Sequence, residues 1–400
     1  MDRAARALAR GDALAALALV GRPSYDSDAR ALLLRGIAYA QMGDVELAKD
    51  ALERARDADP DALTAARVDA ALAEIAASGG EPREASRAAL AAARALEALG
   101  DVRNAAMQRL VAARAEVLLG RLGEARRNVG EALARDLPAD VRAVARLTEA
   151  EIAVRELAAT RAAKALADAK HALASAPHAL LARALAAQES ELRVRVARLF
   201  ERGETRAADL FAIEEASRGD RFLVDACRRI VVAGHARVPL ATRPVLFALL
   251  ASLARAWPSA IRRDVLIAEA FGARKPNASH RARLRVEVGR LRKVLAGIAE
   301  PVATAEGYAL ESPRPVAILL PPTDDADARI ALLLADGATW TAQSIADHAG
   351  VSKRTALRAL AALVESGRAV RVGSARDSRY AGAGGRIASR MLLLGLVPTR

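Results

Sequence analysis

The sequence predicts a mainly α-helical protein whose first half is a stack of helix pairs and whose second half holds two small α+β domains. Up to about residue 218, apolar residues recur at the helical period and are interrupted by Gly, Pro and Asp. Hydrophobic residues make up 53% of the 400 residues and aromatic residues only 3%. The cores must therefore be built from Ala, Leu and Val, which suits closely packed helices. Beyond residue 218, two segments combine helical runs with short alternating strands.

The clearest helix pair is expected between residues 32 and 60. Gly43 and Asp44 supply the turn between the two helices, and Pro60 ends the second. The segment resembles a tetratricopeptide (TPR) repeat at Gly36, Tyr39, Ala48, Leu52, Ala55 and Pro60. Weaker copies of the pattern occupy 117–138 and 149–177.

Residues 1–218 are therefore predicted to form a TPR-like helical solenoid. A single helix pair cannot bury its apolar face, so successive pairs should stack and leave a concave surface. One interpretation is that this surface binds a protein or peptide partner, or a second copy of the chain. The alternative is a rigid spacer, since fold alone does not determine function.

A strongly basic helix is predicted over residues 279–295, followed by a hairpin over 302–310. Leu284, Val288, Leu291 and Leu295 fall on one stripe, and arginine and lysine occupy most of the rest. A cationic helix beside a two-stranded wing has the shape and charge to enter a DNA major groove. The alternative is a solvated, arginine-rich surface helix.

The elements before this helix favour DNA binding. Alternating apolar runs over 222–240 predict antiparallel strands. A helix should follow Thr242 as its N-cap and stop before Pro258, and another should span 262–272. In this order, residues 219–312 resemble the winged-helix output domain of OmpR-type bacterial response regulators. The resemblance implies an α+β winged helix-turn-helix that binds double-stranded DNA, although Glu287 stands where that family commonly has a polar or cationic residue.

The predicted DNA contacts of the basic helix are Arg281, Arg283, Arg285, Val286, Arg290, Arg292 and Lys293. By position, the resemblance implies that Val286 and Arg290 face base edges, whereas Arg292 and Arg285 meet phosphates. A guanidinium can bind guanine O6 and N7 bidentately, which agrees with the role of Arg290. An alternative for the two phosphate-facing arginines is an ion pair with Glu287 or Glu269.

A proline-rich segment, 313–325, is predicted to be an extended linker or an added edge strand. Residues 326–383 should then form three helices and a strand-loop-strand, with Thr341 and Ser352 as N-caps and Gly350 at a turn. The packed stripe of the third helix should be Leu357, Leu360 and Val364.

Residues 326–383 resemble the compact winged helix-turn-helix of many bacterial repressors. The predicted DNA contacts are Ser352, Lys353, Arg354, Thr355 and Arg358 on the third helix, with Arg371, Arg376 and Arg379 on the wing. The alternative is a protein dimerisation module. The apolar tail, 384–400, should dock on its own domain or on a second subunit.

Net charge is concentrated in the second half of the chain. Residues 1–200 carry 30 Lys and Arg against 28 Asp and Glu, whereas residues 201–400 carry 31 against 20, within a formal total of +13. An excess of cations is expected where a chain meets a polyanion such as DNA.

Other classes of protein find little support in the sequence. The single cysteine, Cys227, excludes an internal disulfide and fits a reducing cytoplasm, where a DNA-binding protein would associate with the nucleoid. No run reaches the ~18 to 20 apolar residues of a membrane helix. The five histidines show no metal-ligand spacing, and no phosphate-binding loop or nucleophile motif occurs, so we expect no enzyme activity and no cofactor.

Two hypotheses follow. The first is a cytoplasmic transcriptional regulator that binds duplex DNA through basic winged helices. Its repeats would bind a partner or join two copies of the chain into a homodimer. The second is a protein-interaction scaffold whose winged helices make protein contacts. A steep dependence of DNA affinity on salt would distinguish them.

Overall fold

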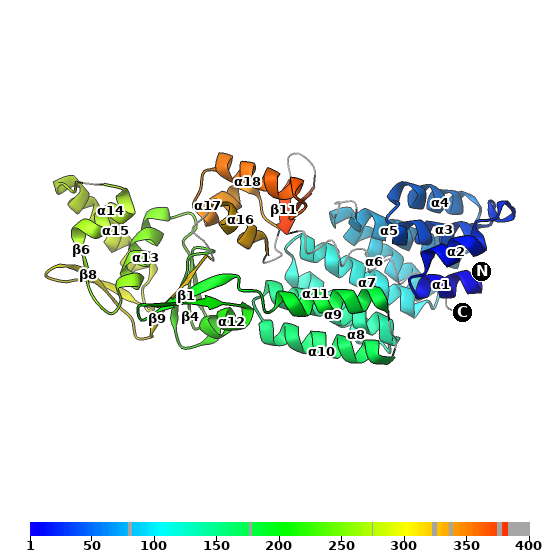
Figure 1. Ribbon diagram of the computed structural model, residues 1–400, viewed down its shortest axis with the longest axis horizontal. Coiled ribbons are helices and arrows are strands. Elements are labelled where there is room, and N and C mark those ends of the chain that lie inside the picture. The colour runs from blue at the N-terminus through cyan, green and yellow to red at the C-terminus, as the bar shows by residue number, and fades with distance from the viewer. Residues whose placement is uncertain are drawn as a thin grey trace. The chain divides into compact units, whose positions relative to one another are not determined.

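The computed structural model describes residues 1–78, 82–175, 178–273, 275–321, 326–335, 339–373 and 378–382. The described chain is mainly helical with a smaller region of mixed sheet (Figure 1), so the predicted mainly α class is confirmed. It forms two compact units. The first contains Met1–Glu191 with the described parts of 335–339 and 367–400, and the second contains Leu192–Leu334 and Trp340–Ser366.

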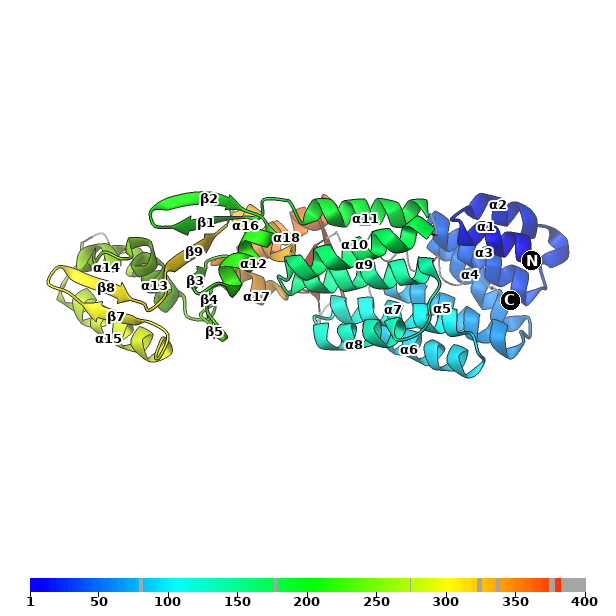
Figure 2. The ribbon, with the colours of Figure 1, turned by 90° about the horizontal axis from the view of Figure 1, so that it is seen from below.

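The first unit is built mainly from antiparallel helix pairs that follow one another along the chain (Figure 2). The first helices of neighbouring pairs also contact each other, as α3, α5, α7 and α9 do in turn. The helices are α1 (Asp2–Ala9), α2 (Ala13–Val20), α3 (Ala29–Met42), α4 (Val45–Asp57), α5 (Ala62–Ser78), α6 (Pro82–Ala98), α7 (Val102–Leu118), α8 (Leu122–Leu133), α9 (Ala139–Arg155), α10 (Ala159–Ser175) and α11 (Ala179–Glu191).

The pair α3 and α4 confirms the helix pair predicted between residues 32 and 60. Gly43 ends α3 in the left-handed region with φ 89°, and the Asp44 carboxylate accepts a hydrogen bond from the Leu47 amide as N-cap of α4. A Cβ on Gly36 would lie 2.6 Å from Leu52 Cγ, so the absence of a side chain there lets the two helices approach closely.

A buried carboxyl group lies between α5 and α7. The Gln108 side-chain amide donates a hydrogen bond of 2.7 Å to Glu74 Oε1, and both residues are buried. Burial raises the pKa of Glu74 well above the ordinary value of 4.5, because it penalises the ionised form more than the hydrogen bond favours it. Glu74 therefore binds a proton more tightly in the folded chain than in the unfolded chain.

We expect Glu74→Gln to stabilise the first unit at neutral pH by about 1 kcal/mol or more, because glutamine keeps the shape without the cost of ionisation. With a raised folded pKa, the wild type should lose stability as pH rises above 4.5, whereas the variant should not. Urea unfolding at several pH values checks this. A stability difference between the two proteins that is the same at pH values near 4.5 and near 7.5 would contradict the prediction.

The second unit begins with a six-stranded sheet in the order β2-β1-β9-β3-β4-β5, in which β3 and β9 are parallel and the other neighbours antiparallel. Its strands are β1 (Ala197–Glu201), β2 (Glu204–Ala208), β3 (Phe222–Asp225), β4 (Ile230–Ala233), β5 (Ala236–Pro239) and β9 (Val316–Leu320), with α12 (Leu210–Arg218) between β2 and β3.

This sheet corrects two predictions. The helical region does not extend to residue 218, because β1 and β2 form a hairpin around Arg202 and Gly203, both with positive φ. The prediction of an extended linker or an edge strand over 313–325 is wrong for the described part, 313–321, because β9 lies inside the sheet between β1 and β3. A strand with neighbours on both sides and buried faces reads as a continuous apolar run, as Val316–Leu320 does.

The next elements are α13 (Pro244–Ala256), β6 (Ile261–Arg262), α14 (Arg263–Phe271), α15 (Ala278–Val294), β7 (Glu300–Ala303) and β8 (Gly307–Glu311). The strands form a sheet in the order β6-β8-β7, and α13, α14 and α15 share one core with them. The prediction of Thr242 as N-cap is wrong. The helix begins at Pro244, whose ring presets the helical φ, and Arg243 occupies the N-cap without a side-chain cap.

The last described elements are α16 (Ala326–Ala335), α17 (Ala342–Ala349), α18 (Lys353–Glu365), β10 (Ala369–Val372) and β11 (Arg379–Gly382). The N-caps Thr341 and Ser352 and the left-handed Gly350 are confirmed. The predicted stripe of α18 is partly wrong, because Leu357 is 41% and Val364 is 37% exposed. The buried stripe is Ala356, Ala359, Leu360 and Leu363, since the small alanines allow close packing.

Candidate nucleic-acid interface

The start of α15 is held by a reciprocal cap. The Asn277 side chain accepts a hydrogen bond of 2.9 Å from the His280 amide, and His280 Nδ1 accepts one of 3.3 Å from the Asn277 amide. His280 thus acts in capping, and the cap fixes where the helix begins relative to α14.

The apolar stripe of α15 is buried as predicted, at Leu284, Val288, Leu291 and Leu295. Successive residues turn by about 100° around a helix, so the opposite face is the one that points outward. That face carries Ser279, Ala282, Val286, Gly289 and Lys293. Apart from the terminal lysine its side chains are small, and Val286 is 55% exposed. The outward face can therefore approach another surface closely.

Arginines flank this small-residue face on both sides. Arg281, Arg285 and Arg292 lie along one flank, and Arg283 and Arg290 lie along the other. Arg285 and Lys293 are exposed and make no hydrogen bond or ion pair with the described residues. The resulting surface has a centre of small residues, charged only at Lys293 near the end of the helix, between two cationic edges.

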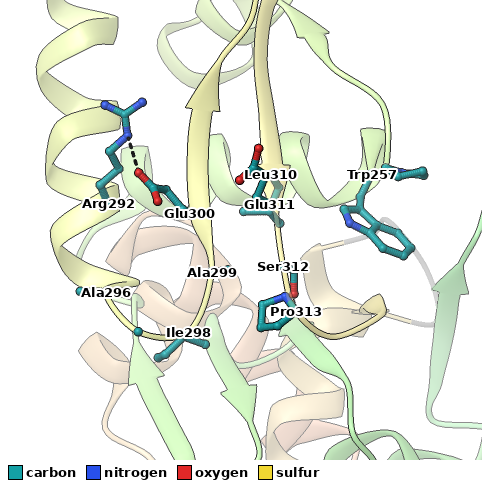
Figure 3. Close-up of a pocket in the computed structure, with 12 residues that line it drawn as sticks. Trp257, Arg292, Ala296, Ile298, Ala299, Glu300, Leu310, Glu311, Ser312 and Pro313 are labelled. Carbon is teal, nitrogen blue, oxygen red and sulfur yellow. Dashed lines mark ion pairs between the residues drawn. The ribbon is translucent and has the colours of Figure 1, made fainter.

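Arg292 connects α15 to the hairpin. Its Nε donates a hydrogen bond of 2.6 Å to the Pro301 carbonyl oxygen and lies 3.9 Å from Glu300 Oε1. Figure 3 shows Arg292 and Glu300 on one side of a hollow of about 880 Å³ and Trp257 on the other. The Nε of Arg292 is therefore occupied within the fold, and only its terminal amino groups remain for a phosphate.

Three further arginines of α15 also contact neighbouring side chains. The Arg283 guanidinium carbon lies 4.6 Å from the centre of the Phe271 ring, and Arg281 lies 4.0 Å from Asp264. Arg290 Nη1 lies 2.8 Å from Glu287 Oε1. The alternative of an ion pair from Arg285 or Arg292 to Glu287 or Glu269 is wrong, since Glu287 pairs with Arg290 and Glu269 accepts a hydrogen bond from Ser252.

One arginine outside the predicted DNA contacts shapes the hairpin. Arg263, at the start of α14, donates hydrogen bonds of 2.9 Å to the Thr304 carbonyl and 3.0 Å to the Ala305 carbonyl. Its guanidinium also lies 5.9 Å from the centre of the Tyr308 ring. These contacts join residues about forty positions apart, so the only local sign of them in the sequence is a cation at the first position of the helix.

The second predicted interface centres on α18. Ser352, Lys353, Arg354 and Arg358 are exposed and Thr355 is partly exposed. The Ser352 hydroxyl accepts a hydrogen bond of 3.1 Å from the Thr355 amide, so this serine serves first as a cap. On the hairpin, the Arg371 guanidinium donates to the Ser378 hydroxyl, and Arg379 donates to the Thr339 carbonyl. Arg376 and the tail 384–400 lie outside the described residues.

No protein-family model matches the chain, and neither the curated proteins nor the solved structures compared with it contain a match. Among the described helices, none combines the length and apolar character that crossing a bilayer requires.

Proposed function

We propose that this chain is a DNA-binding transcriptional regulator of bacterial type that binds duplex DNA with the outward face of α15. The observation that carries the proposal is the arrangement of small residues on this face between two rows of arginines. A major groove presents base edges at its centre and a phosphate backbone on each side, which is the complementary pattern. The element order α13-β6-α14-α15-β7-β8 also supports a winged helix-turn-helix of OmpR type.

In this mechanism the centre of the face reads bases and the edges supply affinity. The Val286 methyl groups can contact a thymine methyl, and Gly289 leaves the helix backbone bare for close approach. Arg281, Arg285 and the terminal amino groups of Arg292 meet phosphates on the hairpin side. The hairpin tip carries Glu306 rather than a cation, so it would contribute to DNA binding through its shape and not through electrostatic attraction.

The helical first unit would then bind a protein or peptide partner, or a second copy of the chain. Stacked helix pairs whose first helices contact one another support a TPR-like solenoid. A homodimer would place two copies of α15 on DNA, with half-sites about one helical turn apart or a multiple of that spacing. Selecting bound sequences from a random duplex pool would show whether the site is palindromic.

A salt titration tests the proposal. Binding of the full chain to duplex DNA should weaken steeply with salt, with a slope of log affinity on log salt of about −0.9 for each phosphate neutralised. Four or more contacts from α15 predict a slope steeper than about −3.5. Binding that is absent at low salt, or insensitive to salt, would reject DNA as the ligand.

Gly289→Ala separates a DNA-contacting role from a structural one. A Cβ at this position meets nothing within 4 Å, so alanine should stabilise α15 by up to about 1 kcal/mol by its higher helix propensity. Duplex affinity should nevertheless fall, because the added methyl group holds the helix away from the base edges. Thermal unfolding and duplex titration check the two effects, and a variant with unchanged affinity would show that DNA does not approach Gly289.

A second candidate function is a protein-interaction scaffold. Leu357 and Val364 leave an apolar stripe exposed on α18, where the sequence pattern expects a buried one. Such a stripe suits a protein contact better than a phosphate backbone. If only the second interface has this role, Lys353→Ala and Arg358→Ala would leave the salt dependence of DNA binding unchanged.

A further inference from the structure

A second cationic feature borders α15 on the side away from the hairpin. A hollow of about 520 Å³ opens between the first turn of α13 and the C-terminal half of α15. Three cations from two distant parts of the sequence line it: Arg243, Arg290 and Lys293. Its other lining residues are Pro244, Val245, Leu246, Val294 and Glu287. No DNA-binding pattern in the sequence includes Arg243.

The charge of this hollow is suited to an anion. Glu287 is the sole carboxylate among the lining residues, and it is already paired with Arg290 at 2.8 Å. Arg243 and Lys293 are exposed, and neither makes an ion pair within the described chain. An anion of tetrahedral or planar shape would be held by cationic side chains that converge from both helices.

The position of the hollow indicates which anion. Arg290 follows Val286 by four residues and lies at the border of the outward face of α15, and Lys293 follows Gly289 by four residues and lies at the end of that face. A duplex whose base edges lie against that face must carry one strand's backbone past this border.

We infer that the hollow between α13 and α15 holds a backbone phosphate of DNA through Arg243, Arg290 and Lys293. This inference rests on the proposed function and adds a contact from a helix outside the basic segment. It also changes the role of Arg290, which binds a phosphate here and is not a reader of base edges. The bases are then read by the small residues at the centre of α15, between phosphate contacts on both flanks.

Arg243→Ala in the full chain tests the inference, with Arg255→Ala as the matched control. Both arginines are exposed: Arg243 is the N-cap residue of α13, and Arg255 lies in the last turn of that helix. Arg243→Ala should weaken binding to every duplex sequence by roughly tenfold at low salt and make the salt slope shallower by about 0.9. Arg255→Ala should change neither. Thermal unfolding of both variants verifies that the fold is kept.

Arg290→Ala provides an independent outcome. A phosphate contact predicts a uniform loss across sequences, whereas a base contact predicts relaxed sequence preference at one position. An unchanged slope in Arg243→Ala, or relaxed preference in Arg290→Ala, would overturn the inference while the wild type still binds DNA. Failure of the wild type to bind duplex DNA would instead overturn the proposed function and the inference with it.

A free anion is the other source of the same chemistry. To test this source, thermal unfolding of the wild type and of Arg243→Ala is followed while inorganic phosphate replaces chloride at constant ionic strength. Equal changes in the unfolding temperature of the two proteins support a DNA phosphate as the occupant. Protection of the wild type alone against thermal unfolding by millimolar phosphate, together with an unchanged DNA slope in Arg243→Ala, would assign the hollow to a free anion.

Discussion

Replacing Gly307 by alanine should lower the free energy of unfolding of the second unit by about 3 kcal/mol or more. A Cβ at this position would lie 1.9 Å from the Ile261 carbonyl oxygen and 2.9 Å from the Arg262 Cα atom. These are backbone atoms of the strand that pairs with β8, so they cannot move aside as a flexible side chain would. The β6-β8 pairing must open, and the hairpin beside α15 loses its support. Urea unfolding followed by circular dichroism measures the loss.

Gly289→Ala is the matched control, because it makes the same chemical change on the same unit at a site with open space. The two substitutions should shift stability in opposite directions. A Gly307→Ala variant as stable as the wild type would mean that β6 and β8 do not approach each other this closely.

Val286→Glu should reduce duplex affinity by roughly a hundredfold or more, since like charges facing each other across an interface cost several kcal/mol. Val286 lies at the centre of the outward face of α15 and is 55% exposed, so the fold should accept the glutamate. Its carboxylate would meet base-edge acceptors and stand between two phosphate backbones. Duplex titration at fixed salt, with thermal unfolding as the check on folding, measures both effects.

Val194→Glu makes the same change at a valine that is 49% exposed, outside the proposed interface. Its effect on affinity should be small. Equal losses in the two variants would indicate that added negative charge weakens binding wherever it is placed, and that the outward face of α15 has no special role.

The features predicted best from the sequence are those set by neighbouring residues. The stripe Leu284, Val288, Leu291 and Leu295 follows from the helical period alone, and it is buried as predicted. The caps at Thr341 and Ser352 and the turn at Gly350 also follow from local hydrogen bonding and backbone freedom.

Features that depend on distant residues could not be derived in this way. The strand β9 pairs with β1 and β3, each about a hundred residues away, and a run flanked by prolines resembles a linker until those partners are known. Arg243 joins the candidate site only because α13 packs beside α15. The predicted stripe of α18 is wrong at two of its three positions, because Ala356 and Leu363 face the core in place of Leu357 and Val364, whereas Leu360 is buried as predicted.

The central place of β9 has a practical consequence for dissecting the protein. The segment from α13 to β8 leaves the six-stranded sheet after β5 and returns to it through β9, so it is an insertion between strands of one sheet. A fragment cut at residues 219 and 312 would leave β3 with a bare edge and invite aggregation. A fragment that keeps Leu192 through Pro321 retains every strand of that sheet, and is the smallest piece in which the basic helix should be studied alone.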